Sequence, residues 1–175
     1  FSRFLAIDAL LICLLWYPQS SIAAPPTAWD VAVLDEILAA VPPGETLATV
    51  GDMRIRADLL LKWRNKLAGQ PGVNFAFDGV ATAWPGGNVY YTFDPSVSLA
   101  KQKAFLDGAA EWAMFANLHF IPRTAQANYI TIREIPSLGG GQSAVGMVGG
   151  QQFLDLGPGA WSRAIICHEI GHALG

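Results

Sequence analysis

Charged residues are scarce in this sequence. Asp, Glu, Lys and Arg make up 14% of its 175 residues, against about 25% in an average soluble domain. Lys and Arg together number 11 and Asp and Glu 14, so the formal net charge is −3. Binding of nucleic acid depends on clustered positive charge. The charge balance therefore excludes a protein that binds nucleic acid through its surface charge.

Long apolar runs are also missing. The run over residues 9–17 has nine residues, whereas a transmembrane helix needs about 20. Arg3 precedes this run and small residues follow it over 20–24, which is the pattern of a secretory signal peptide. We therefore predict a signal peptide over residues 1–24 and export to the extracellular space or periplasm, with no stable membrane span after cleavage. An uncleaved anchor is the alternative.

Cysteine is nearly absent, because Cys13 and Cys167 are the only two in the chain. Cys13 lies within the predicted signal peptide, so cleavage would leave Cys167 alone and exclude an intrachain disulfide. An exported domain without disulfides depends on its apolar core or on a bound metal. The hydrophobic content of 52% excludes a disordered chain and supplies such a core.

The rest of the chain divides into two segments. Residues 25–77 are predicted to be helical, because apolar residues recur at three- and four-residue spacing in a first helix that ends near Val41 and in a second over 56–67. Residues 69–72, Gly-Gln-Pro-Gly, are the best candidate for a linker. Residues 78–175 have a different pattern.

Strand-forming residues dominate this second segment. Val, Ile, Tyr and Phe are concentrated in short runs between glycines and polar residues. The sequence predicts strands at 88–93, 118–121, 129–134 and 151–156, and helices from Ser98 to about 116 and over 161–174. Strands mixed with two long helices predict an α+β domain in which a sheet is laid on helices.

The last eight residues contain the pattern H-E-x-x-H, with His168, Glu169 and His172, followed by x-x-Gly175. On an α-helix, residues four apart lie one turn apart on the same face. Both imidazoles can then reach one ion, and two imidazole nitrogens at this spacing suit Zn²⁺. We therefore predict one catalytic zinc ion, with His168 and His172 as ligands.

Glu169 is turned by about 100° from His168 around the helix. This position is poor for a third ligand but close enough to contact water on the metal, so we predict that Glu169 is the general base of peptide-bond hydrolysis. Two other residues of types that bind metals are predicted to have structural roles instead. His119 alternates with apolar residues in a predicted strand, and Cys167 is predicted to be a buried small hydrophobe.

A catalytic zinc site uses three protein ligands. Gly175 fits the metzincin pattern H-E-x-x-H-x-x-G-x-x-H, in which the third ligand follows three residues later, beyond this sequence. We therefore expect a chain that is truncated after its active-site helix. In this interpretation residues 78–175 are the N-terminal half of a catalytic domain and have little or no activity on their own.

With these residues the sequence resembles the astacin family of zinc metalloendopeptidases, from about residue 49 to 175. The resemblance rests on the zinc motif and on blocks in the family's order, which are WPGGNVYY at 84–91, FIPRT at 120–124, YITI at 129–132 and SAVG at 143–146. It implies a metzincin-like N-terminal subdomain, with a twisted mixed sheet, a backing helix and an active-site helix, preceded by a small helical pro-segment. It also implies protein or peptide substrates.

The resemblance implies two further sites. The family's upper edge strand, which pairs antiparallel with extended substrate, corresponds to Gln142, Ser143, Ala144 and Val145; a plain structural edge is the alternative. Astacin zymogens place the aspartate of a Phe-x-Gly-Asp motif on the zinc. Here Gly51-Asp52 matches the second half of that motif, with Thr49 in place of Phe. Asp52 is thus a candidate latency switch in a propeptide, with Asp78 as a weaker rival and an ordinary helix-flanking aspartate as the alternative.

Two other functions remain open at this point. A gluzincin would take its third ligand, a glutamate, from a later helix. An exported peptide-binding module would keep the sheet edge and carry only a vestigial zinc site.

Overall fold

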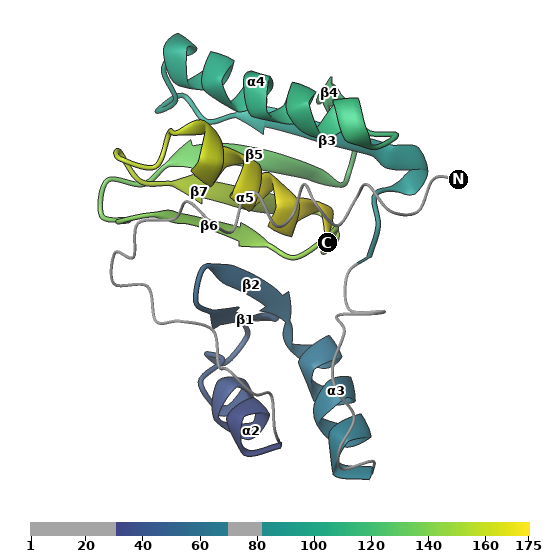
Figure 1. The fold of residues 1–175 in the computed structure, drawn as a ribbon. Helices are drawn as coiled ribbons and strands as arrows, with labels where there is room; N and C mark the ends of the chain where they lie inside the picture. The colour runs from purple at the N-terminus through teal and green to yellow at the C-terminus, as the bar shows by residue number, and fades with distance from the viewer. Residues whose placement is uncertain (1–30, 70–81) are drawn as a thin grey trace.

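Residues 31–69 and 82–175 are described by the computed structural model of the chain (Figure 1). The predicted signal peptide over 1–24 lies outside the described residues. So do Asp78 and all but the first residue of the predicted linker.

Residues 31–69, called the N-terminal unit below, contain two helices with a β-hairpin between them. The elements are α2 (Val31–Ala39), β1 (Leu47–Val50), β2 (Met53–Arg56) and α3 (Ala57–Gly69). Both helices agree with the predicted helical spacing, and the side chains that it places inward are buried, as at Leu34 and Leu60. The hairpin was not predicted, so the helical description of this segment is incomplete.

The hairpin forms because a two-residue turn joins two short runs of alternating character. Val50 pairs with Met53, which leaves Gly51 and Asp52 as the turn. Gly51 has φ 61°, a conformation that glycine adopts without steric cost, and Gly-Asp is among the dipeptides that form tight hairpin turns. The sequence therefore carried the signal for this hairpin, although the helical pattern on either side obscured it.

Residues 82–175 form the predicted α+β arrangement. The predicted strands and helices are present, with shifts of one or two residues at some ends. The elements are a 3₁₀ turn (Pro85–Gly87), β3 (Asn88–Phe93), α4 (Leu99–Phe115), β4 (His119–Pro122), β5 (Tyr129–Glu134), β6 (Gly141–Ala144), β7 (Gln151–Leu156) and α5 (Arg163–Leu174).

One mixed sheet of seven strands runs through the described residues, in the order β1-β2-β6-β7-β5-β3-β4. The β1–β2 and β6–β7 pairs are antiparallel, and the other neighbours are parallel. Strand β2 of the N-terminal unit thus continues the sheet beyond β6. The hairpin is part of the same sheet as the strands that follow residue 82.

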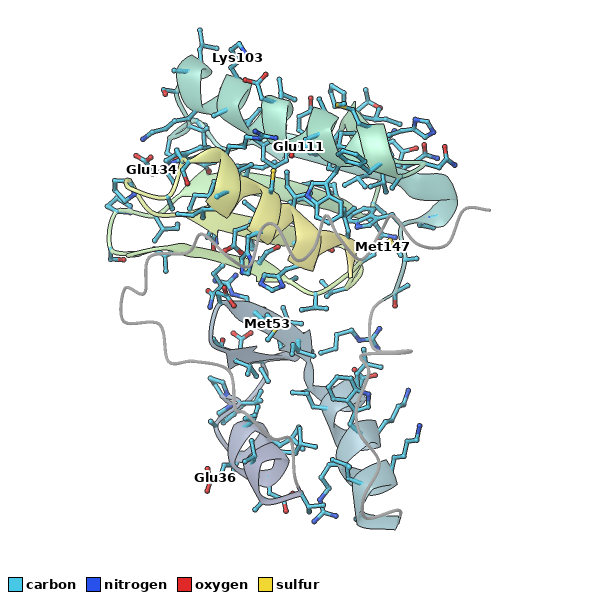
Figure 2. The ribbon with its side chains drawn as sticks, in the orientation of Figure 1. Glu36, Met53, Lys103, Glu111, Glu134 and Met147 are labelled. Atoms are coloured by element: carbon cyan, nitrogen blue, oxygen red, sulfur yellow. The ribbon has the colours of Figure 1, made fainter. Side chains whose placement is uncertain are left out.

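Helices α4 and α5 lie together on one face of this sheet (Figure 1). Phe105 of α4 is fully buried and contacts the rings of Tyr91, Phe93 and Phe120 from the strands. Glu111 of α4 reaches α5 (Figure 2), where it accepts hydrogen bonds of 2.5 and 2.6 Å from Arg163. The main core is therefore formed by the sheet and these two helices.

A second, separate core lies inside the N-terminal unit. Its buried members come from both helices and the hairpin: Leu34, Ala48, Val50, Ile55, Leu60, Trp63 and Leu67. Val145, just after β6, packs against this second core. The N-terminal unit therefore has apolar stabilisation of its own and meets the rest of the chain at β6.

Replacement of Phe105 tests the main core. Phe105→Ala removes a side chain with no exposed surface, so we expect the free energy of unfolding to fall by about 3–5 kcal/mol. Chemical denaturation followed by tryptophan fluorescence measures this change. The neighbouring Leu106→Ala is the control, because Leu106 is 40% exposed and its loss should cost less than about 1 kcal/mol. Equal losses in the two variants would contradict this description of the core.

Candidate metal centre

Helix α5 brings the two histidines of the motif to one face. Ser162 caps the helix and accepts a hydrogen bond from the Ile165 amide at 3.5 Å. The four-residue spacing then sets the Nε2 atoms of His168 and His172 3.0 Å apart. As the sequence predicts, both imidazoles present a ring nitrogen to the same point in space.

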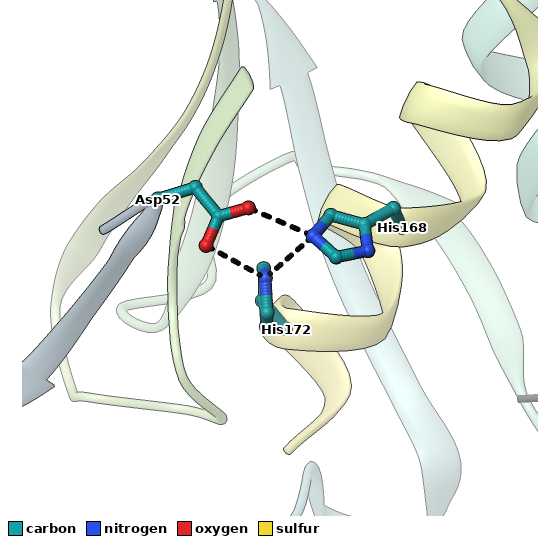
Figure 3. A group of neighbouring side chains, drawn as sticks. All are labelled: Asp52, His168 and His172. Atoms are coloured by element: carbon teal, nitrogen blue, oxygen red, sulfur yellow. Dashed lines mark hydrogen bonds and ion pairs between the residues drawn. The ribbon is translucent and has the colours of Figure 1, made fainter. Parts of the chain in front are cut away.

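Asp52 lies directly opposite the two histidines (Figure 3). Its Oδ2 atom is 2.8 Å from Nε2 of His168, and its Oδ1 atom is 3.5 Å from Nε2 of His172. The hairpin turn between β1 and β2 carries this carboxylate into the site. A residue 116 positions away in the sequence therefore completes a group of three potential metal ligands.

The charge state of Asp52 follows from these contacts. Burial opposes ionisation of its carboxyl group, but the hydrogen bonds with His168 and His172 outweigh burial and hold its pKa well below the usual range. Asp52 is therefore ionised at neutral pH and offers an anionic oxygen to the site.

The three residues fit a zinc ion. Ligand atoms of Asp52, His168 and His172 all lie within 4.8 Å of one another. Tetrahedral zinc with bonds of about 2.0–2.1 Å keeps its ligand atoms roughly 3.3 Å apart, and the separations here are 2.8, 3.0 and 3.5 Å. Two imidazoles and one carboxylate are also a donor set that catalytic zinc sites use.

The surroundings of Glu169 differ from those of Asp52. It has no exposed surface, and neither of its carboxyl oxygens has a hydrogen-bond partner among the described residues. Its side chain lies against the backbone of Gly141 so closely that a methyl group at that glycine would overlap it. Burial, with the charges of Asp52 and Asp155 adding to it, raises the pKa of Glu169 to about 9.

Such a group does not stabilise the fold. A buried carboxyl group without partners costs free energy, so its presence points to a role in chemistry. Its neutral form in this structure is a consequence of the closed surroundings and of the nearby Asp52.

The predicted substrate-binding strand corresponds to β6 and the residue after it. Of the four predicted residues, Ser143 and Ala144 are buried, whereas Gln142 and Val145 are partly exposed. Strand β6 is not an edge here, because β2 pairs with it: the amide of Ser143 donates to the Asp52 carbonyl at 3.0 Å, and that of Val145 to the Arg54 carbonyl at 2.9 Å. The N-terminal unit thus covers this strand.

Sequence reasoning missed a row of polar residues that joins β2 to the sheet. Arg54 donates hydrogen bonds to Gln142 and to Asp155, and Asp155 also accepts two from Arg133. No spacing in the sequence relates Arg54 to Asp155, which lies 101 positions away. The sequence offered one indication that Arg54 lies near the site, because Arg54 follows Asp52 by two residues.

His119 and Cys167, which were predicted to have structural roles, lie where those predictions place them. His119 lies exposed in β4, and it is outside the group of three potential ligands. Cys167 is buried, and its thiol contacts Glu111 at 3.6 Å. Within residues 31–69 and 82–175, no helix combines the length and apolar character needed to cross a membrane.

Comparison with known proteins identifies relatives of this chain. The sequence model of the peptidase family described as "Astacin" matches residues 77–175, more than half of the chain. Zinc metalloproteinase nas-15 of Caenorhabditis elegans is 34% identical over 93 residues, which are 53% of this chain and 16% of that protein. Zinc metalloproteinase nas-32 of the same organism is 35% identical over 98 residues, 56% of this chain and 14% of that protein.

Among solved structures, high choriolytic enzyme 1, a hatching enzyme zinc-protease from Oryzias latipes, is similar with a TM-score of 0.48 and 24% identity. The match covers 59% of this chain and 52% of that one. The chain thus spans about half of this structure, and about one sixth of the two curated relatives named above.

Zinc titration tests the group of three ligands. We expect Zn²⁺ to bind the 175-residue chain and raise its melting temperature, because an ion that binds only the folded state stabilises it. Asp52→Ala removes one ligand and should weaken binding by at least about 10-fold. Isothermal titration calorimetry measures the affinity.

The control is Asp58→Asn, because Asp58 is an exposed carboxylate of the N-terminal unit that pairs with Arg56. This variant should bind zinc like the unchanged chain. Equal affinities of Asp52→Ala and the unchanged chain would exclude Asp52 as a ligand.

Proposed function

The chain belongs to the astacin family, and from this premise we propose that the protein is a zinc-dependent metalloendopeptidase that hydrolyses peptide bonds. The observation that supports the proposal most is the combination found on one turn of α5. Two imidazole nitrogens lie 3.0 Å apart, and the residue after the first histidine is a fully buried carboxyl group that has no hydrogen-bond partner within residues 31–69 and 82–175.

In this proposal His168 and His172 hold the metal and Glu169 is the general base. Zinc, when bound, polarises a substrate carbonyl and lowers the pKa of water toward neutrality. The protein's part is to fix the ligands on a rigid helix and to keep the base beside them. Glu169 accepts a proton from the attacking water and returns it to the amine that leaves.

Glu169 can act as a base only when its carboxylate form is accessible. In this structure burial and the charge of Asp52 both favour the neutral form. Departure of the N-terminal unit would remove the Asp52 charge. Loss of this charge favours the carboxylate form, so release of this unit would also prepare the base.

Strand β6 is the proposed binding site for the substrate backbone. An extended peptide that adds to a sheet edge gains main-chain hydrogen bonds. The amides of Ser143 and Val145 are the donors for this purpose, and both are used here by the Asp52 and Arg54 carbonyls. Protein and peptide chains are therefore the proposed substrates.

The N-terminal unit is the proposed propeptide, and Asp52 its switch. Two observations support this view. The Asp52 carboxylate lies where it would serve as a ligand in place of the attacking water, and β2 occupies the strand to which substrate would bind. One hairpin would thus block the metal and the substrate site together.

The direction of β2 explains how a peptide in this position can avoid cleavage. Strand β2 pairs with β6 in the parallel direction, whereas astacin substrates are expected to pair antiparallel with the corresponding strand. A reversed backbone presents its carbonyls and amides in the opposite order to the base and the metal. The hairpin can then occupy the site without aligning a peptide bond for attack.

Export is part of the proposal. It is supported by the leader pattern at residues 1–24. Direct sequencing of the N-terminus of secreted protein would locate the cleavage point.

Replacement of Glu169 tests the mechanism. We expect Glu169→Gln in the full-length, zinc-loaded and processed protein to lower kcat by roughly 10²–10⁴-fold, because the amide cannot accept the proton. The KM for a peptide substrate should change little. Cleavage of a fluorogenic peptide measures both constants.

Glu111→Gln serves as the matched control, since Glu111 pairs with Arg163 at the start of α5 and lies outside the group of ligands. Its kcat should stay within about twofold of the unchanged protein. Full activity of Glu169→Gln would refute the mechanism. A processed protein that binds peptides but cleaves none would instead support the peptide-binding module.

Replacement of Asp52 tests latency. In the uncleaved full-length precursor, Asp52→Ala should raise activity toward a peptide too short to need pairing with β6, because the metal loses its competing ligand while β2 remains on β6. The expected gain is about 10-fold or more, as for loss of a metal ligand. Asp58→Asn should leave the precursor as inactive as the unchanged form. A precursor of Asp52→Ala that stays silent toward such a short peptide and becomes active on processing would refute this prediction, because latency would then not depend on Asp52.

A further inference from the structure

A row of four polar side chains runs across the sheet from β2 of the hairpin to β5. Its members are Arg54, Gln142, Asp155 and Arg133. The Nε and Nη2 atoms of Arg54 donate to Oε1 of Gln142 at 2.9 and 2.6 Å, and Nη2 also donates to Oδ2 of Asp155 at 3.0 Å. Arg133 donates to both carboxylate oxygens of Asp155, at 2.7 and 2.8 Å, and its guanidinium lies 3.6 Å from the centroid of the Phe153 ring.

This row lies on the sheet face away from α4 and α5. Asp155 is directly opposite Gln142 on one side and Arg133 on the other, and residues that face each other across strands project from the same face. Leu154 and Leu156, on either side of Asp155 in β7, pack into the core with the helices. Since side chains alternate along a strand, Asp155 projects from the opposite face.

Asp155 is a buried carboxylate with two arginine partners. Its side chain is only 3% exposed, while those of Arg54 and Arg133 are 26% and 28% exposed. A buried carboxylate requires partners, and removal of one is costly. Arg133 belongs to the same sheet and stays in place, whereas Arg54 belongs to the N-terminal unit.

Departure of the N-terminal unit would leave a defined set of acceptors. Gln142 Oε1 would lose two donors and Asp155 Oδ2 would lose one. Gln142 belongs to the strand to which a substrate backbone would bind, and Asp155 belongs to the next strand of the sheet. An occupant must therefore donate hydrogen bonds, and a planar fork of N–H groups matches the arrangement that Arg54 now satisfies.

We propose that Gln142 and Asp155 form a subsite for an arginine side chain of the peptide substrate, and that Arg54 fills this subsite in the precursor. The inference rests on the proposed peptidase function and adds a substrate class to it. Lysine, which offers a point charge without the planar fork, should bind less well than arginine.

Strand pairing explains why the occupant is a side chain of the bound peptide. A peptide residue opposite Gln142 would have its Cβ atom about 4.5–5.5 Å from that of Gln142 and would project from the same face. A side chain as long as arginine then reaches Asp155, one strand further into the sheet. Arg54 does the same from its place opposite Ala144.

Paired peptides provide the test. The processed full-length protein is given two series of fluorogenic peptides that differ only in arginine or its neutral isostere citrulline, moved one position at a time. We expect one position at which kcat/KM for arginine exceeds that for citrulline by on the order of 10- to 100-fold. Asp155→Asn and Gln142→Met should each reduce this ratio toward one.

The control variant is Glu134→Gln. Glu134 is also a carboxylate near the end of its strand, but it pairs with Lys101 and Trp161 on another part of the sheet and lies well away from Met53 of β2 (Figure 2). Its arginine-to-citrulline ratio should equal that of the unchanged protein. If Asp155→Asn fails to fold, Gln142→Met decides, because it leaves the Asp155–Arg133 pair intact.

The outcomes separate this inference from the proposed function. Cleavage of both series at equal rates at every position would overturn the subsite and leave the peptidase function standing. Cleavage of no peptide would overturn the peptidase function. In that case fluorescence anisotropy on the same protein decides the subsite: tighter binding of an arginine peptide than of its citrulline partner, lost in Gln142→Met, supports it, and equal binding overturns it.

Discussion

The pairing of β2 with β6 is the contact on which the arrangement of this chain depends. It joins two units that each have their own apolar core, and its register fixes where the hairpin turn lies. Met53 is opposite Ser143. The turn residue before it, Asp52, meets the two histidines of α5, and Arg54, on the other face of the sheet, meets Gln142. A shift by one residue would turn alternate side chains to the other face and would remove both contacts.

The junction is polar, and this affects how firmly it holds. Among the described residues, Asp52 and Arg54 find their charged partners across the boundary, while Val145 supplies apolar contact. Such contacts persist easily while both sides belong to one chain, because the connection gives a high effective concentration. If the chain were cut between residues 69 and 82, as the proposed processing requires, the same contacts would also have to offset the lost freedom of two separate molecules. Processing would therefore weaken the junction without any change in its contacts.

The sequence predicted the local structure around the two histidines better than it predicted the contacts of the N-terminal unit. His168 and His172 follow from helical spacing alone, and β3, β5 and β7 from runs of strand-forming residues, because local patterns determine them. The β1–β2 hairpin was overlooked between two helical patterns, although Gly51-Asp52 is a turn signal. Resemblance to a family suggested Asp52 as a partner of the metal. The pairing of Arg54 with Asp155 depends on which strands become neighbours, and no local pattern encodes that.

One close contact links the proposed base to the proposed substrate strand. Glu169 lies against the backbone of Gly141 with no room for a side chain at that glycine, and Gln142 follows directly. The strand that would hold the peptide backbone is therefore the same strand that fixes the position of the carboxyl group. A peptide paired with β6 would take its register from the amides of Ser143 and Val145. These residues follow Gly141 closely in the chain, so the position of the peptide relative to Glu169 is set by this one segment. In a site built this way, β6 aligns both the substrate and the base.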